Sequence, residues 1–505
     1  MRRPSTRALA MAAVAVALLT AASTARANAV DENVMKGIEQ LYNVQFDEAA
    51  RSFDRAIAAD PKDPRGYFYR ANVHLWSYVF DARPEQLARY MSASERGIKA
   101  AEARLKANPR DHVAKLFLGM TYGFRAISNA RAENVMSAAL SAKACHDRLS
   151  EVVRADPKLY DAYLGLGIFH YVFGTIPEAG QVVIGMGGIK GDAALGIREI
   201  ETAAARGRYF RNDAQLIVAL LNIYHRDDLK RGLSGLETMA RRYPKNVAIQ
   251  YAIGSAFLDQ QQPERAVPWF ERVAKAGNND FRAITTMSVG RTGMAYFQRN
   301  DFTRARGYLQ RFLRDGNENV LRAHSWYLLG VCNEMLGDRS LAVKAYERAV
   351  KSPGHTSPED LTAQRRAKAL LKSPMSDVDR QLVRATNAAA SQGSAEAERI
   401  ARATLATRGI SASQRAIANY ALGQSLQARG SHREAIDAYT AALRSGNHSE
   451  SWIAPWSHYQ MGVCWEKLGN VTKQRESFRQ AGSYKGYDGQ VQLRFKLQRN
   501  VTTID

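Results

Sequence analysis

Cysteine is scarce in this sequence. The 505 residues include three cysteines, Cys145, Cys332 and Cys464. An odd and sparse set argues against a disulfide framework. Each cysteine also falls at a helical position where burial is expected, and a buried cysteine behaves as a small hydrophobic side chain. We therefore expect three free thiols.

Motifs that carry chemistry are lacking as well. The sequence has no H-E-x-x-H pattern, no paired C-x-x-C motifs and no G-x-S-x-G elbow, which excludes the common zinc and serine-hydrolase sites. The nearest approach to a cofactor motif is VVIGMGGIKG at 182–191, but Lys190 occupies the last position of the G-x-G-x-x-G fingerprint. Helices rather than strands are expected on both sides of it. We predict a non-enzymatic chain with no catalytic residue, cofactor or metal.

Acidic residues are outnumbered by basic ones. The chain has 49 Asp and Glu against 71 Lys and Arg, a net charge of +22, and such a charge attracts anionic surfaces. The arginines are spread along helices, often beside Asp or Glu, which is typical of solvated faces. Two interpretations follow: a solvated surface without a specific anionic partner, or a basic module that binds anionic envelope polymer or lipid.

Long apolar runs are absent after the first 27 residues. Three arginines within the first seven residues precede an apolar run of about 15 residues, and an Ala-Arg-Ala cleavage pattern follows at 25–27. The run is shorter than the roughly 20 residues that cross a bilayer, so the pattern predicts a cleaved secretory signal peptide, residues 1–27. We expect a periplasmic, cell-envelope or secreted protein with no transmembrane segment in the mature chain and no nucleic-acid partner.

The most informative stretch is Trp326–Ala349, WYLLGVCNEMLGDRSLAVKAYERA. Small residues at Gly330 and Ala342 would let two antiparallel helices approach closely, with Tyr346 beside the contact. Gly337 and the Asp after it would end one helix and cap the next. The stretch resembles a tetratricopeptide repeat (TPR), whose hairpins bury their apolar faces by stacking. The resemblance implies an all-α, right-handed superhelical solenoid.

Further hairpins continue this pattern along the chain. We expect about ten or eleven of them, some with lengthened helices. Three prolines around one basic helix predict a joint between two blocks, and a Gly-rich insert interrupts the first block. The predicted parts are an N-terminal block over 28–350, the insert at 174–192, the joint at 351–374 and a C-terminal block over 375–505.

Three strings suggest a finer resemblance. GIEQLYNVQFDEAARSF, FGTIPEAGQVVIGMGGIKGDAALGIREIE and YKGYDGQVQLRFKLQ begin at Gly37, Phe173 and Tyr484. They are similar to segments of the inclusion-body-clearance and tetratricopeptide-repeat-39 family. That resemblance implies a non-enzymatic helical-repeat adaptor and provides no catalytic residue. The family is intracellular and eukaryotic, unlike a chain with this leader, so its cellular role is not carried over.

A repeated tyrosine marks the candidate binding residues. If Gly254, Gly330, Gly423 and Gly462 are equivalent, the residue three positions earlier is tyrosine each time. In TPR proteins this position faces the concave groove, where an aromatic stripe suits an extended or helical peptide. Alternatively, the tyrosines only fill gaps between neighbouring hairpins. The candidate residues, including two that border the stripe, are Tyr251, Tyr327, Tyr420, Tyr459, His324 and Trp456. We predict a scaffold that binds a protein or peptide partner in this groove.

Overall fold

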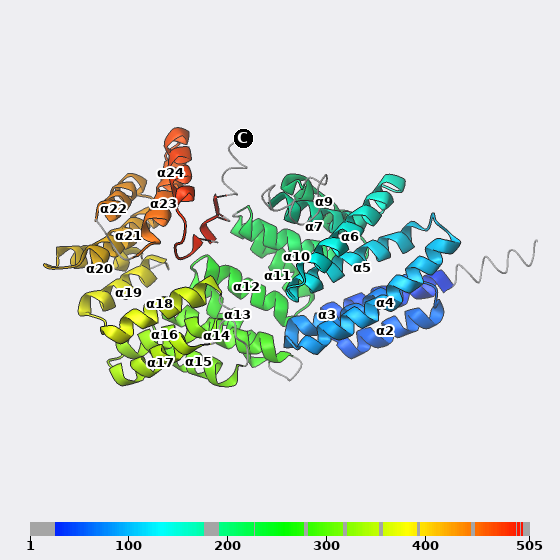
Figure 1. Cartoon of the computed structure of the whole chain (residues 1–505), viewed down its shortest axis with the longest axis horizontal. Coiled ribbons are helices and arrows are strands. Elements are labelled where there is room, and N and C mark those ends of the chain that lie inside the picture. The colour runs from blue at the N-terminus through cyan, green and yellow to red at the C-terminus, as the bar shows by residue number, and fades with distance from the viewer. Residues whose placement is uncertain are drawn as a thin grey trace, which may run out of the picture. The chain divides into compact units, whose positions relative to one another are not determined.

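The computed structural model describes residues 26–175, 191–226, 228–276, 281–316, 321–352, 357–390, 394–445, 450–490, 492–494 and 496–497. Helices joined by short turns make up these ranges, and no strand occurs within them (Figure 1). Almost all of the predicted leader (1–27) and Gly-rich insert (174–192) lies outside the described residues. Two compact units divide the chain, Met1–Ile249 and Gln250–Asp505.

The first unit is built from consecutive helical hairpins. A helix over residues 26–42 precedes α2, and α3 pairs with α4, α5 with α6, α7 with α9 and α10 with α11. The longest members have 20 to 24 residues, as expected for lengthened hairpins. The bounds are α2 (Phe46–Ala59), α3 (Pro64–Asp81), α4 (Pro84–Ala107), α5 (His112–Arg131), α6 (Val135–Ala155), α7 (Ala162–Thr175), α9 (Ala193–Arg206), α10 (Arg211–Tyr224) and α11 (Leu229–Arg242).

The second unit repeats the arrangement with shorter helices. Here α14 pairs with α15, α16 with α17, α19 with α20, α21 with α22 and α23 with α24. The prediction of an all-α, TPR-like solenoid is confirmed. The bounds are α12 (Val247–Asp259), α13 (Pro263–Lys275), α14 (Arg282–Gln298), α15 (Phe302–Asp315), α16 (Arg322–Met335), α17 (Arg339–Lys351), α18 (Pro358–Lys372), α19 (Asp377–Ala390), α20 (Ser394–Ala406), α21 (Ala412–Ala428), α22 (His432–Arg444), α23 (Ile453–Lys467) and α24 (Val471–Ser483).

In four hairpins of the second unit a glycine lies where the two helices cross. A Cβ atom on Gly330 would lie 2.3 Å from the Tyr346 ring, so any side chain there would force the helices apart. The other three glycines meet a second-helix ring in the same way: Gly254 meets Phe270, Gly423 meets Tyr439 and Gly462 meets Phe478. The predicted close approach is confirmed, and the four glycines are equivalent.

Replacing Gly330 by alanine is expected to destabilise the second unit by about 1 to 3 kcal/mol, because the new methyl group overpacks the crossing. Gly307 in α15 provides the matched control, since a Cβ atom there would meet nothing within 4 Å. Gly307→Ala should instead stabilise the helix by roughly 0.5 to 1 kcal/mol. Urea unfolding followed by circular dichroism measures both changes. Equal effects of the two variants would contradict the crossing argument.

The division between the compact units differs from the predicted joint at 351–374. Pro358 is the first residue of α18 and follows the N-cap residue Ser357. Proline is well suited to the first turn of a helix. Asp360 is buried and accepts hydrogen bonds from the backbone N–H groups of Leu321 (3.1 Å) and His324 (2.8 Å). Helix α18 thus packs on α16 and α17 within the second unit, and the predicted joint at 351–374 stays a prediction.

All three cysteines are free thiols, as expected, and all three are buried. Burial raises the pKa of Cys145, Cys332 and Cys464 to about 12 in each case. A thiol with so high a pKa carries almost no thiolate at neutral pH, and the thiolate is the reactive form. The cysteines therefore serve packing rather than chemistry.

Candidate functional site

The four candidate tyrosines occupy equivalent places in their hairpins. Each ring packs on the second-helix aromatic residue that also abuts the crossing glycine, as in Tyr327 on Tyr346, with ring centroids 6.3 Å apart. The other pairs are Tyr251 with Phe270 (5.6 Å), Tyr420 with Tyr439 (5.5 Å) and Tyr459 with Phe478 (5.5 Å). The rings thus contribute to packing inside each hairpin, and a role in partner binding stays a prediction.

Tyr327 lies beside a charged and aromatic group that sequence reasoning missed. The guanidinium of Arg366, on α18, interacts with the Tyr327 side chain and lies 3.2 Å from the Glu450 carboxylate. Glu450 also accepts a hydrogen bond from the Trp452 indole N–H (2.6 Å), and the Trp452 ring meets Tyr420 edge-on at 4.9 Å. We call Tyr327, Arg366, Glu450 and Trp452 the Arg366 cluster. It links two of the predicted tyrosines.

Trp456 and Tyr459 form a second part of the same region. Their ring centroids are 5.9 Å apart at 78°. The end of the chain packs on them: Tyr487, Leu493 and Leu497 share a buried cluster with Tyr459, and Trp456 lies against that cluster. Aromatic rings therefore line this part of the predicted groove, and Tyr487, Leu493 and Leu497 cover it.

His324 borders the Arg366 cluster. Burial lowers the pKa of His324 to about 4; nearby Arg291 and Arg366 act in the same direction, and Glu359 opposes them. The imidazole is thus neutral at physiological pH, and His324 adds no charge to this face. For Tyr327, burial is the main cause of a raised pKa, and the positive charge of Arg366 opposes it.

Five of the six predicted residues, all except Tyr251, belong to or border the two groups described above. Arg366 and Trp452 link Tyr327 to Tyr420, while Trp456 and Tyr459 meet under the end of the chain. Tyr251 is placed only against Phe270 within its own hairpin. Sequence reasoning interpreted Arg366 as part of a solvated face, because its carboxylate partner Glu450 is 84 positions away and only the fold brings them together. We call the surface formed by the Arg366 cluster, Tyr420, Trp456 and Tyr459 the aromatic–basic face.

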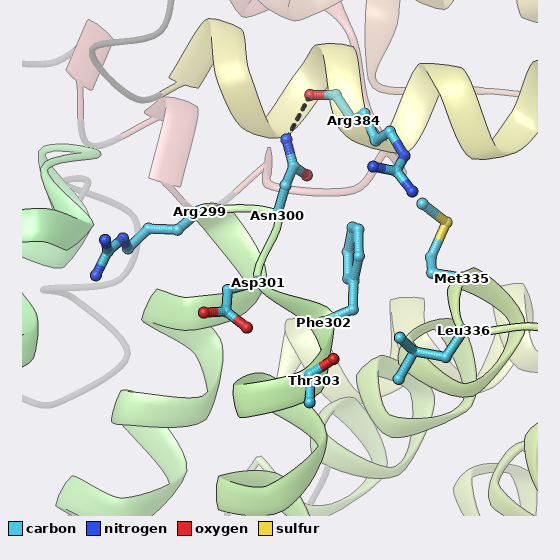
Figure 2. A pocket seen from close by; sticks show the side chains of 8 residues that line it. All are labelled: Arg299, Asn300, Asp301, Phe302, Thr303, Met335, Leu336 and Arg384. Carbon is cyan, nitrogen blue, oxygen red and sulfur yellow. Dashed lines mark hydrogen bonds between the residues drawn. The ribbon is translucent and has the colours of Figure 1, made fainter.

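A pocket of about 480 Å³ opens elsewhere in the second unit, at the turns that end α14 and α16 (Figure 2). Asn300 donates a hydrogen bond to the Arg384 carbonyl oxygen (3.0 Å), and Asp301 caps α15 through the Arg304 N–H (3.0 Å). The Arg384 guanidinium lies over the Phe302 ring. These groups hold the turns together, so the pocket is structural. Its lining residues are Arg299, Asn300, Asp301, Phe302, Thr303, Met335, Leu336 and Arg384.

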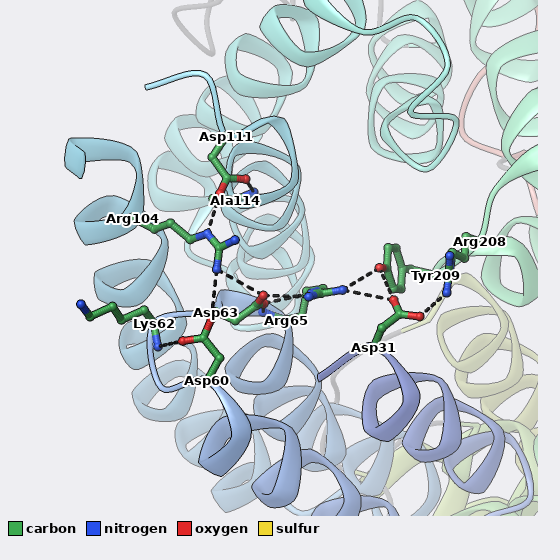
Figure 3. Close-up of polar contacts among 10 residues, drawn as sticks. All are labelled: Asp31, Asp60, Lys62, Asp63, Arg65, Arg104, Asp111, Ala114, Arg208 and Tyr209. Carbon is green, nitrogen blue, oxygen red and sulfur yellow. Dashed lines mark hydrogen bonds and ion pairs between the residues drawn. The ribbon is translucent and has the colours of Figure 1, made fainter. Parts of the chain in front are cut away.

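The first unit contains a buried ion network (Figure 3). Arg65, 8% exposed, donates to both oxygens of Asp63 (3.0 and 2.8 Å), to Asp31 (3.1 Å) and to the Tyr209 hydroxyl (2.9 Å). Arg104, which lies on α4, forms an ion pair with Asp63 (3.3 Å). The network ties the helix over 26–42 to α3, α4 and the segment before α10. Since every member is paired, we assign it to stability.

Within the described ranges, no group of three or more His, Cys, Asp or Glu side chains is placed to hold a metal ion. In the same ranges, no helix combines the length and apolar character needed to cross a membrane.

The sequence pattern and the hairpin geometry agree with a known repeat family. Residues 34–75, 224–281 and 291–356 match the tetratricopeptide repeat family. These three ranges are therefore similar to tetratricopeptide repeats. The matched ranges include the hairpin Trp326–Ala349 from which the pattern was predicted. The comparison with curated proteins found no match to this sequence.

The solved structures that match this chain share little sequence with it. A structure described as the functional characterisation of Pseudomonas aeruginosa pilF is 14% identical, covers 50% of this chain and 96% of its own, and has a TM-score of 0.34. The apo quorum sensor NprR from B. thuringiensis is 11% identical, covers 83% and 99%, and has a TM-score of 0.35. The TPR domain of P58(IPK) is 14% identical, covers 88% and 99%, and has a TM-score of 0.20. No function is inferred from these likenesses.

Proposed function

We propose that this chain is an exported, non-enzymatic scaffold that binds a protein or peptide partner on the aromatic–basic face of its second unit. TPR repeats generally mediate protein–protein interaction, and the proposal adds the face and the compartment. The proposal rests on the contacts within the Arg366 cluster, which brings together Tyr327, Arg366, Glu450 and Trp452. Aromatic rings beside a guanidinium offer stacking, hydrogen-bonding and ionic contacts to a peptide.

The export part of the proposal rests on residues 1–27. A cut after Ala27 would leave the buried residues of the helix over 26–42 in the mature chain, because the first of them is Val30. The mature chain would carry a charge of 22 − 4 = +18, since the leader holds four arginines. The similarity to the inclusion-body-clearance and tetratricopeptide-repeat-39 family is also part of this proposal, and only its adaptor role is carried over.

A crosslinking pull-down from envelope fractions tests the proposed face. The bait is the mature chain, 28–505, and the test variant carries Tyr327→Ala and Tyr459→Ala. We expect a discrete protein to be captured at both low and high salt and to be lost with the variant. Because Tyr459 is buried, circular dichroism must show that the variant is folded. The variant with Tyr327→Phe and Tyr459→Phe is the matched control, since it keeps the ring packing.

Capture only at low salt, unchanged by the tyrosine replacements, would overturn the groove proposal. Exposed charges are screened within about 8 Å at physiological salt, so binding driven by the mature chain's net charge of 22 − 4 = +18 should collapse as salt rises. That outcome would favour the alternative, a basic module that holds anionic envelope polymer or lipid.

A further inference from the structure

We propose that residues 484–490 are a built-in occupant of the aromatic–basic face, and that the partner presents the same chemistry: an aromatic side chain followed by a carboxylate. This inference rests on the proposed function, because it names what binds to the same face. We call residues 484–490 the docked segment.

The docked segment forms a tight loop. Helix α24 ends at Ser483, and Tyr484 continues in extended conformation. Gly486 (φ 71°) and Gly489 (φ 79°) then adopt left-handed conformations that other residues rarely take. The N–H of Gly486 donates to the Gln490 side-chain oxygen (2.8 Å), which closes the loop. Two glycines and a closing hydrogen bond thus present Tyr487 and the residue after it at the tip.

The aromatic half of the tip is held by α23 and α24. Tyr487 is 8% exposed and belongs to one buried cluster with Tyr459 and Phe478. A Cβ atom on Gly489 would lie 3.0 Å from the Trp456 indole nitrogen, so the backbone of the loop lies against that ring. Both Trp456 and Tyr459 were predicted from the repeat pattern to face a ligand. In the structure, Tyr487 and Gly489 of the docked segment pack against these two residues.

The acidic half of the tip is held by α18. Asp488 forms an ion pair with Arg365, and its other oxygen lies 3.9 Å from Arg366. Just beyond the loop, Gln492 donates to the Glu359 carboxylate (2.5 Å). The carboxylate of Asp488 thereby reaches Arg366, which also contacts Tyr327 and Glu450. An aromatic ring and a carboxylate on adjacent residues therefore satisfy the apolar and the basic parts of the face together.

The contacts of the tip suit a replaceable occupant. The Arg365 side chain is 63% exposed and that of Asp488 is 16% exposed, so solvent reaches this ion pair from the Arg365 side and screens it in part. The docked segment competes well because its short tether gives it an effective concentration on the order of millimolar. A free peptide with the same two anchors must overcome that concentration. Releasing the tip should therefore raise the affinity for such a peptide at least tenfold.

Peptide binding to the full mature chain, 28–505, tests this inference. The probe is a fluorescently labelled synthetic peptide with the sequence of residues 484–497, followed by anisotropy. Asp488→Lys in the protein places a positive charge against Arg365 and should release the tip, so we expect at least tenfold tighter probe binding than in the unmodified chain. Asp437→Lys makes the same charge change at an exposed position on α22 and should bind as the unmodified chain does.

Two further arms separate the possible outcomes. Tyr487→Ala in the protein removes the aromatic anchor and should also strengthen probe binding, which provides a second test if Asp488→Lys does not fold. A probe whose Tyr487 and Asp488 equivalents are both alanine should not bind. Equal probe affinity in the unmodified chain and in both released variants would overturn the built-in occupant, and so would undiminished binding of the double-alanine probe.

The pull-down distinguishes failure of this inference from failure of the proposed function. A protein captured equally by the unmodified bait and by the Asp488→Lys bait, yet lost with Tyr327→Ala and Tyr459→Ala, would overturn the occupant while leaving partner binding in place. Stronger capture by Asp488→Lys supports the inference directly.

Discussion

Replacing Arg65 by methionine is expected to destabilise the first unit by about 3 to 5 kcal/mol, the usual cost of removing one partner from a buried ion pair. Methionine fills much of the space but leaves the Asp63 carboxylate, 2% exposed, without its paired donors. The Asp31 carboxylate and the Tyr209 hydroxyl lose a partner as well. The value should fall near 3 kcal/mol, because Arg104 still reaches Asp63. Urea unfolding followed by far-ultraviolet circular dichroism measures the change.

Arg70 on the same helix supplies the control. It pairs with Asp54 on the surface, where the two side chains are 29% and 58% exposed, and exposed pairs contribute about 0 to 1 kcal/mol. Arg70→Met should therefore have little effect. Adding Asp63→Asn to Arg65→Met should restore part of the loss, because it removes a buried charge that has lost its main partner, and asparagine still caps α3. Equal losses in the two methionine variants would show that burial of the network does not matter.

The repeat pattern predicted the fold because it records contacts between residues close in sequence. Gly330 and Tyr346 are 16 positions apart, and their spacing reports directly that two helices cross. The position of α18 was not predictable in this way. Its prolines suggested a joint, yet Pro358 only begins the helix, and Asp360 anchors it to residues 36 and 39 positions earlier. Local composition does not encode such distant contacts.

The candidate site shows the same limit. The tyrosines were found because they recur at one register, but their neighbours do not. Asp488 and Arg365 are 123 positions apart, and no periodicity relates a C-terminal loop to a helix in the middle of the unit. The usable signal was composition: YKGYDG holds two glycines around a Tyr-Asp pair, which favours a turn. The fold alone shows what that turn meets.

A partly buried carboxyl group gives the first unit a specific response to pH. Asp213 lies in the first turn of α10. Burial, together with the nearby charge of Asp161, raises its pKa from the ordinary 3.8 to about 6, while the nearby Tyr42 side chain opposes the shift. The folded chain therefore keeps this proton up to about pH 6, whereas the unfolded chain releases it near pH 4. Folded stability should fall as pH rises through this window and then level off.

Asp213→Asn should remove this loss of stability at higher pH. A shift of about two pKa units corresponds to about 3 kcal/mol, so the variant should be more stable than the unmodified chain by up to this amount at pH 7 and about equal to it at pH 4.

Asp47→Asn is the matched control, because Asp47 is an exposed carboxylate in the first turn of α2. Its loss should weaken the helix by roughly 0.3 to 1 kcal/mol at pH 7, since a negative charge there stabilises the helix dipole. Urea unfolding at pH 4, 5, 6 and 7 measures both variants. A stability gain for Asp213→Asn that does not change with pH would show that the variant acts through packing, since a proton held in the folded state must produce a gain that grows between about pH 4 and pH 6.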